Sequence, residues 1–271
     1  MFSTVGQKRE AFRALHRAGC FVIPNPWDVG SARYLASLGF KALATTSSGF
    51  AWSKGRPDNG VSLEQALGHF EEMAASVELP INGDFEGGFA IEPERVAANV
   101  SRAIATGIAG LSIEDSTGAP ANPLFEFALA VERVRAASEA IAGTGLILTA
   151  RSEGFLVGRP DLDETLRRLG AYAEAGADCL YAPRIKSRDA IAAVVRAVAP
   201  KPVNVLVGGS PATVAELAAL GVRRISVGGA LARAAWKGFM SAASEIASHG
   251  TFQGLESAVP FAEVNGLFQG P

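Results

Sequence analysis

The chain of 271 residues carries 25 Lys and Arg against 27 Asp and Glu, so its formal net charge is −2 at pH 7. Hydrophobic residues make up 48% and charged residues 19%, a composition typical of a folded globular protein that excludes disordered, collagen-like and disulfide-dense chains. The near-neutral balance gives no electrostatic reason to bind nucleic acid or an anionic membrane surface.

No segment is predicted to span a membrane or to direct secretion. The longest uncharged stretch, residues 202–215, contains two prolines and a Gly-Gly pair, whereas a spanning helix needs about 20 apolar residues. Residues 1–10 are polar, and no apolar run follows Lys8 and Arg9 as it does in a signal peptide. Cys20 and Cys179 lie in apolar segments and are expected to be buried and reduced. We therefore expect a cytoplasmic protein.

Short apolar runs alternate with stretches of helical pattern along nearly the whole chain, and glycines such as Gly39, Gly107, Gly176 and Gly221 stand where helices should end. This alternation predicts parallel strands joined by right-handed crossovers. Eight such units in about 250 residues predict an α/β protein, a (β/α)8 TIM barrel, as a single domain over residues 1–271. A doubly wound open sheet is the alternative, but IPNPWDVG rather than GxGxxG follows the first strand. The predicted strands are Cys20–Pro24, Ala42–Thr46, Leu79–Asp84, Gly110–Glu114, Leu146–Ala150, Cys179–Pro183, Val203–Val207 and Arg224–Val227.

Residues 231–271 form a C-terminal extension beyond the eighth strand. A helix is predicted over 231–248, and an apolar, aromatic tail follows it. Packing of the tail on its own barrel and packing on a neighbouring subunit are both consistent with this pattern.

Acidic residues gather at the predicted carboxyl ends of strands 3 and 4, the end of a barrel where active sites lie. Strand 3 ends in Asp84, with Glu86 two residues on, and strand 4 ends in Glu114 and Asp115. Because buried carboxylates repel one another and are costly to desolvate, a cation would stabilise this set. Oxygen ligands without a neighbouring His or Cys favour Mg²⁺ or Mn²⁺ over zinc. In the structural alternative, the carboxylates cap helices or pair with the arginines that follow strands 5 and 6.

Groups at two other strand ends are suited to bind an acid. Arg151 follows directly on the fifth strand, and a guanidinium there can hold a carboxylate with two hydrogen bonds. The stretch 45–49 after strand 2 is small and hydroxylated, and its backbone N–H groups can hold a second anionic oxygen. The residues themselves assign no role to Glu153, Arg184 or Asn204.

Other site chemistries have weaker support. A Schiff-base aldolase needs a lysine in the barrel mouth, but no lysine ends a predicted strand, and Lys186 after strand 6 comes nearest. A Ser-His-Asp hydrolase is not supported, because GxSxG is absent and the histidines fall in helical or tail segments, at His16, His69 and His249. The glycines after strands 7 and 8, with Ser210 and a proline behind the first pair, could bind a phosphate, although this is also ordinary turn chemistry.

Four motifs give the chain a resemblance to the isocitrate lyase/phosphoenolpyruvate mutase superfamily. They are GRPD at 55–58, NGDFEGGF at 82–89, LSIEDSTG at 111–118 and TARSEGF at 149–155, and the similarity extends over most of the chain. The resemblance implies a (β/α)8 barrel that acts on a small-molecule 2-oxo acid with Mg²⁺. It also implies a homo-oligomer, a dimer or tetramer, in which the last helix is exchanged between subunits.

The same resemblance implies roles for particular residues. The metal-side carboxylates of the superfamily are matched by Asp84, its companion Glu86, Glu114 and Asp58, which would hold the ion mostly through water. The substrate-binding positions are matched by Thr46, Ser47, Ser48, Asp84 and Arg151. Catalytic roles are expected for Arg151, Glu114 and Asp58, with Arg151 holding the substrate carboxylate.

The loop after strand 4 departs from the superfamily pattern. Isocitrate and methylisocitrate lyases have K-[KR]-C-G-H there, with the Cys as acid/base, whereas EDSTGAPANPLFEF at 114–127 contains no Cys, Lys or His. The mutases place a Lys and an Asn in this loop, and here Asn122 is present without a lysine. The glutamate that lyases place after strand 6 is also missing, because Pro183 and Arg184 stand there.

These features predict a Mg²⁺-dependent lyase that acts on a small 2-oxo or hydroxy acid through an enolate-like intermediate. Decarboxylation is preferred to methylisocitrate cleavage, since it needs no protonating Cys. The alternatives are phosphonopyruvate mutase or hydrolase chemistry, a non-catalytic 2-oxo-acid binding protein, and a phosphate-sugar enzyme that uses the glycines after strands 7 and 8.

Overall fold

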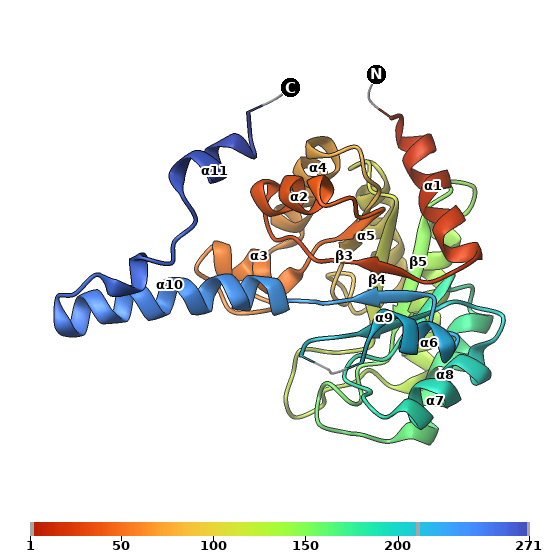
Figure 1. Cartoon of the computed structure of the whole chain (residues 1–271). Helices are drawn as coiled ribbons and strands as arrows, with labels where there is room; N and C mark the ends of the chain where they lie inside the picture. The colour runs from red at the N-terminus through yellow and green to blue at the C-terminus, as the bar shows by residue number, and fades with distance from the viewer. Residues whose placement is uncertain (1–2, 210–211, 270–271) are drawn as a thin grey trace.

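The structure, a computed structural model, describes residues 3–209 and 212–269. Eight parallel strands form one sheet in the order β1-β8-β7-β6-β5-β4-β3-β2, with helices packed around it (Figure 1). At the remaining seam, the Ala44 N–H donates to the Pro24 carbonyl over 3.1 Å, so the sheet is a nearly closed barrel. The predicted (β/α)8 fold is confirmed, and the open doubly wound sheet is excluded. The strands are β1 Phe21–Ile23, β2 Leu43–Ala44, β3 Ile81–Asp84, β4 Gly110–Glu114, β5 Ile147–Arg151, β6 Cys179–Tyr181, β7 Val203–Leu206 and β8 Arg224–Ser226.

Local sequence signals set the helix boundaries. Thr4, Asp28 and Ser62 each form a capping box at a helix start. After α7 and α9, Gly176 and Gly221 adopt the left-handed backbone that ends a helix, with φ of +106° and +88°. The helices are α1 Val5–Arg17, α2 Val29–Ser37, α3 Ser47–Ser53, α4 Leu63–Ser76, α5 Pro93–Ile104, α6 Phe127–Ala140, α7 Leu162–Glu174, α8 Arg188–Val198, α9 Val214–Ala219, α10 Ala230–His249 and α11 Phe261–Gly266, with a 3-10 turn η1 at Gln253–Leu255.

Most strands are shorter than the predicted apolar runs. The clearest case is β2, which keeps two residues because the chain turns into α3 directly after it, with Thr46 as the N-cap. The hydroxylated stretch after strand 2 is therefore a strand-to-helix turn at the carboxyl end of the barrel.

The inside of the barrel is polar below its mouth. The Arg224 guanidinium, 4% exposed, donates to Asn204 Oδ1 over 2.9 Å and to Thr149 Oγ1 over 3.0 Å. Asn204 in turn donates to Ser226 Oγ over 2.9 Å. Asn204 thus belongs to a hydrogen-bonded layer of the barrel interior. At the amino-terminal end, Phe12 of α1 is fully buried against the strands and closes the barrel.

Helices α10 and α11 form a C-terminal arm in which α10 projects from the barrel and the chain then turns back (Figure 1). Behind α11, the Phe268 ring lies close to Gly30 of α2. The helix predicted over 231–248 is present as α10, which buries Ala232 and exposes Phe239 to 63%. Phe252 and Phe261 farther along the arm are 63% and 84% exposed. Exposed apolar surface of this extent is typical of an interaction site. Among the helices of the described residues, none is long and apolar enough to cross a membrane.

Candidate functional site

The strand register brings the predicted site residues together at the carboxyl end of the barrel. Asp84 at the end of β3 pairs with Ser112 of β4. Glu114 at the end of β4 pairs with Arg151 of β5, and Arg151 pairs with Tyr181 of β6. Residues from four consecutive strands therefore meet at one rim, which is where active sites of this fold lie.

Arg151 is the centre of this cluster. Its guanidinium donates from Nη1 to Asp84 Oδ1 and from Nε to Glu153 Oε1, each over 2.8 Å, and its Nη2 lies 3.0 Å from Glu114 Oε2. The Arg151 side chain is 13% exposed, and the three carboxylates are 17%, 0% and 12% exposed respectively. The pairing considered as the structural alternative is thus present for Asp84 and Glu114. It neutralises part of the acidic cluster with one cation.

The turn after β2 contacts the same carboxylates. Ser47 donates to Asp84 Oδ2 from its backbone N–H over 3.1 Å and from its Oγ over 2.9 Å. Its Oγ also lies 3.4 Å from Asp58 Oδ1, which brings the GRPD aspartate to the edge of the cluster. Thr46 Oγ1 and Ser48 Oγ are hydrogen-bonded over 3.1 Å. All eight residues predicted for the site therefore lie at this rim, but their roles remain predictions.

Glu86 occupies the most constrained position in the cluster. Its backbone is left-handed, with φ of +48°, and the residue is 8% exposed. Among the described residues, its Oε1 has no hydrogen-bond partner. Burial, aided by the neighbouring Asp84 and Asp58 carboxylates, raises the pKa of Glu86 to about 8. A non-glycine residue held in this conformation is costly and is often found at functional sites.

The cluster carries more buried carboxyl groups than Arg151 can stabilise in the charged form. Burial raises the pKa of Glu114 well above its usual value, even though Arg151 acts in the opposite direction. Burial likewise raises the pKa of Glu153, whose Oε2 is also buried without a partner within the described part of the chain. Buried acidic groups in this state would be stabilised by an added cation.

The oxygen-rich donor set fits Mg²⁺ or Mn²⁺, which bind carboxylates and keep several waters. Within residues 3–209 and 212–269, no three Asp, Glu, His or Cys side chains converge as a ready-made set of direct metal ligands. The residues that would hold such an ion are the predicted Asp84, Glu86, Glu114 and Asp58, and this role remains a prediction.

Asp115 is not part of this set, contrary to its grouping with Glu114 from the sequence. Its Oδ2 accepts from Tyr172 Oη over 2.6 Å and from Arg168 Nη1 over 3.1 Å, and its Oδ1 accepts the Glu153 N–H over 2.8 Å. Asp115 therefore faces away from the cluster and holds the backbone of Glu153 in place.

Two residues at the rim, Glu153 and Tyr181, received no role from the sequence. Glu153 stands two residues after Arg151. In an extended chain, alternate side chains point to the same side, so this spacing could have predicted that Glu153 lies beside Arg151. The Arg151 Cζ lies 5.2 Å from the Tyr181 ring centroid, and burial raises the pKa of this phenol to about 12.

The groups needed for the other chemistries lie elsewhere. His69 is buried on α4 and stacks on Phe50 with ring centroids 3.9 Å apart, and His16 is buried on α1. Lys186 and Arg184 are exposed in the loop after β6. The phosphate-loop hypothesis depends on Ser210 and its proline, which lie outside the described residues.

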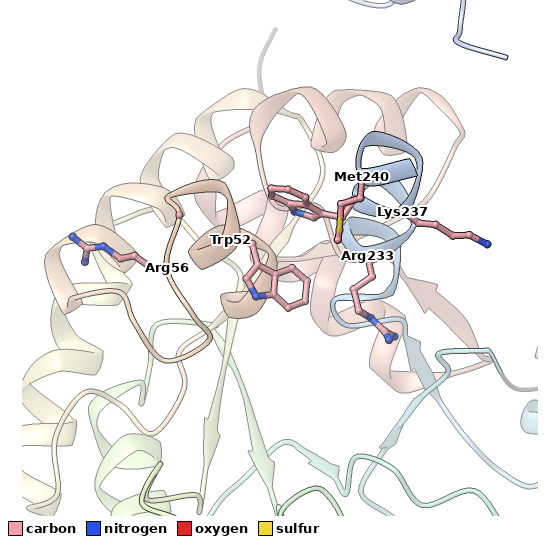
Figure 2. Close-up of a pocket in the computed structure, with 7 residues that line it drawn as sticks. Trp52, Arg56, Arg233, Lys237 and Met240 are labelled. Atoms are coloured by element: carbon pink, nitrogen blue, oxygen red, sulfur yellow. The ribbon is translucent and has the colours of Figure 1, made fainter. Parts of the chain in front are cut away.

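A second feature lies where α3 meets the C-terminal arm. A cavity of about 670 Å³ is lined by Trp52, Gly55, Arg56, Arg233, Trp236, Lys237 and Met240. Figure 2 shows the Trp52 ring facing α10, from which Arg233, Lys237 and Met240 project. The lining contains no carboxylate, so this cavity is distinct from the Arg151 cluster.

Comparisons with known proteins agree with this geometry. A protein from Burkholderia cenocepacia J2315, assigned provisionally as a lyase or mutase, has a crystal structure with a TM-score of 0.94 and 49% identity that covers 98% of this chain and 97% of its own. A phosphonopyruvate hydrolase solved with oxalate and Mg²⁺ has a TM-score of 0.82 and 27% identity, and covers 96% and 95% of the two chains. An oxaloacetate decarboxylase from Bradyrhizobium sp. is 27% identical over 83% of this chain and 78% of its own.

The model of the phosphoenolpyruvate phosphomutase family matches residues 12–247, which include all eight strands and every residue of the cluster. The resemblance seen in four motifs is thereby confirmed, and the chain belongs to the phosphoenolpyruvate phosphomutase family.

Proposed function

We propose that the protein is a lyase that depends on Mg²⁺ or Mn²⁺ and acts on a small 2-oxo or hydroxy acid through an enolate-like intermediate. Oxaloacetate decarboxylation is the preferred reaction. The observation that supports this proposal is the excess of buried carboxylates around Arg151, next to the Thr46–Ser48 turn. This excess supports the proposal that a divalent ion binds among the carboxylates and that Arg151 holds an anionic substrate.

The residues of the rim divide the work of binding. A guanidinium has more N–H donors than the three bonds of Arg151 use, so it can hold a substrate carboxylate while Asp84 and Glu114 keep it in place. The turn after β2, whose Ser47 N–H and Oγ donate to Asp84, is proposed to hold a second substrate oxygen. A divalent ion, when bound, supplies positive charge to the keto oxygen where negative charge develops.

The loop after β4 favours decarboxylation among the possible reactions. Its 114–127 segment has no Cys, Lys or His, so it offers no such side chain to protonate the leaving fragment of a C–C cleavage. Loss of CO₂ breaks the C3–C4 bond of oxaloacetate without a protonated side chain, and the enolate that remains can take its proton from water to give pyruvate. The oxaloacetate decarboxylase relative is consistent with this choice. The phosphonopyruvate hydrolase relative favours P–C bond chemistry as the second candidate.

The proposal includes the assembly and its location. The exposed apolar side chains of α10 and α11 support exchange of the C-terminal arm between subunits of a dimer or tetramer. Cys20 and Cys179 are free thiols, which is consistent with a cytoplasmic protein.

The test is the rate of pyruvate formation from oxaloacetate, measured with Mg²⁺ and with EDTA against a background of Mg²⁺ without protein. The intact chain should exceed the background only with Mg²⁺, and D84A should not exceed it. D178A removes an aspartate at the opposite end of the barrel, before β6, and should keep the rate. A rate that D84A leaves unchanged would refute the site. Turnover of phosphonopyruvate in a ³¹P NMR time course, with none of oxaloacetate, would select the second candidate.

A further inference from the structure

Arg133 of α6 is a buried arginine that binds main-chain oxygens. The residue is 1% exposed, and none of the ion pairs found among the described residues includes it. Its guanidinium donates instead to three backbone carbonyls, those of Gly87, Ala90 and Ile91. All three belong to the turn that follows β3.

This turn carries Glu86, so Arg133 holds the backbone next to a metal-side carboxylate. Glu86 and Phe89 both have left-handed backbones, with φ of +48° and +55°, and such residues persist only where the surroundings hold them. The Glu86 carbonyl also accepts the Glu114 N–H over 3.0 Å. A shift of this turn would therefore move Glu86 and Glu114 together.

A face of the same guanidinium contacts the loop after β4. The Arg133 Cζ lies 3.9 Å from the centroid of the Phe125 ring, within the range of a cation–π contact. The Phe125 N–H donates to the Asp115 carbonyl over 2.9 Å, and the Phe125 carbonyl accepts from Arg168 Nη1 over 3.1 Å. Ser116 and Leu124 form an isolated antiparallel bridge across the loop after β4. Phe125 follows this bridge and, through its hydrogen bonds, forms the fixed base of the loop.

We propose that Arg133 is a positioning residue that ties the Glu86 turn to the Phe125 base of the β4 loop and thereby sets the metal affinity of the rim. The inference rests on the proposed function, since it concerns the same carboxylates. In the described part of the chain, Arg133 forms no ion pair with these carboxylates. It acts through the backbone on which Glu86 is mounted.

The chemistry of the contact requires arginine. The planar guanidinium can donate to three carbonyls from its edges while its apolar face stacks on an aromatic ring. A lysine keeps the positive charge but offers one compact donor group and no plane to stack on Phe125. Burial lowers the pKa of Arg133 to about 10, so the group is charged at neutral pH.

The test is direct Mn²⁺ binding to the full chain, followed by the electron paramagnetic resonance signal of the free ion. R133K should bind Mn²⁺ about tenfold or more weakly, the effect typical of groups that orient metal ligands. F125L removes the ring contact and should also weaken Mn²⁺ binding. If R133K does not fold, the Mn²⁺ affinity of F125L tests the inference in its place.

The control is K8M. Lys8 of α1 is also a buried cation that donates to two carbonyls, those of Ala74 and Val77, but these carbonyls lie at the end of α4, before β3. K8M should keep the Mn²⁺ affinity of the unmodified chain even where urea unfolding shows a loss of stability. A K8M chain that loses affinity as R133K does would overturn the inference, because the effect would then follow stability alone.

The remaining outcomes separate this inference from the proposed function. Binding by the unmodified chain with R133K and F125L within twofold of it would overturn the positioning role and leave the metal site standing. No Mn²⁺ binding by the unmodified chain would overturn the proposed function and this inference with it.

Discussion

Replacement of Arg151 by Gln should lower the free energy of unfolding by several kcal/mol. The guanidinium bonds to Asp84, Glu114 and Glu153, and none of the four side chains is more than 17% exposed. Removal of one partner from a buried ion pair costs about 3–5 kcal/mol, because the remaining charge is left uncompensated. For a chain of this size, that cost corresponds to a fall in Tm of roughly 6–20 °C.

The assay is urea or thermal unfolding of R151Q in EDTA, beside R188Q as the matched control. Arg188 donates to Glu216 over 3.1 Å, but the two side chains are 59% and 44% exposed. An exposed pair contributes about 0–1 kcal/mol, so R188Q should be close to the unmodified chain. Addition of Mg²⁺ should recover part of the R151Q loss. If R151Q is as stable as R188Q, the reasoning about a buried carboxylate cluster is wrong.

Three further predictions concern other parts of the molecule. Burial lowers the pKa of His69 to about 4 from 6.5, so the unfolded chain binds more protons in this window and stability falls as the pH drops through it. Between pH 7 and 4.5, the free energy of unfolding of H69F, measured with urea, should fall by about 2 kcal/mol less than that of the unmodified chain. If the two chains lose stability in parallel over this range, the lowered pKa of His69 is wrong. G110A should destabilise the chain by about 1–3 kcal/mol, because a Cβ there would lie 2.6 Å from the Phe12 ring, whereas G68A, with nothing within 4 Å, should not. F239E on the arm should lower the mass measured by light scattering, and L38E, at an exposed barrel position of similar accessibility, should leave it unchanged.

The fold was predictable because its signals are local. Alternating apolar runs and helical stretches indicate the strands and crossovers without any knowledge of distant contacts, and Gly176 and Gly221 end helices through their own backbone conformation. The boundaries were less predictable. Only the tertiary structure shows that β2 stops after two residues, because the turn into α3 is fixed by contacts of Ser47 with Asp84.

The site was predictable as a set of residues but not as a network. From their motifs and their positions at strand ends, Asp84, Glu114 and Arg151 were predicted to lie at one rim, and the strand register confirms this location. The opposite directions of Glu114 and Asp115 depend on Arg168 and Tyr172, which lie more than fifty residues away in the sequence.

The carbonyl contacts of Arg133 have no sequence signature. Its partners at Gly87, Ala90 and Ile91 are backbone atoms 42–46 residues away. A backbone carbonyl is the same for every residue type, so no side-chain pattern identifies it as an arginine partner. Only the tertiary structure shows that α6 brings Arg133 to the turn after β3.

The most direct test of the proposed metal-dependent 2-oxo-acid site is the thermal stability of the intact chain with pyruvate, oxaloacetate, 2-oxoglutarate or phosphonopyruvate, each in Mg²⁺ and in EDTA. A ligand at about 100 times its Kd should add roughly 2.7 kcal/mol of stability. We predict that at least one of these acids raises the Tm in Mg²⁺, that EDTA abolishes the rise, and that D84A shows none. A rise that is equal in EDTA, or no rise with any acid, would contradict the proposal.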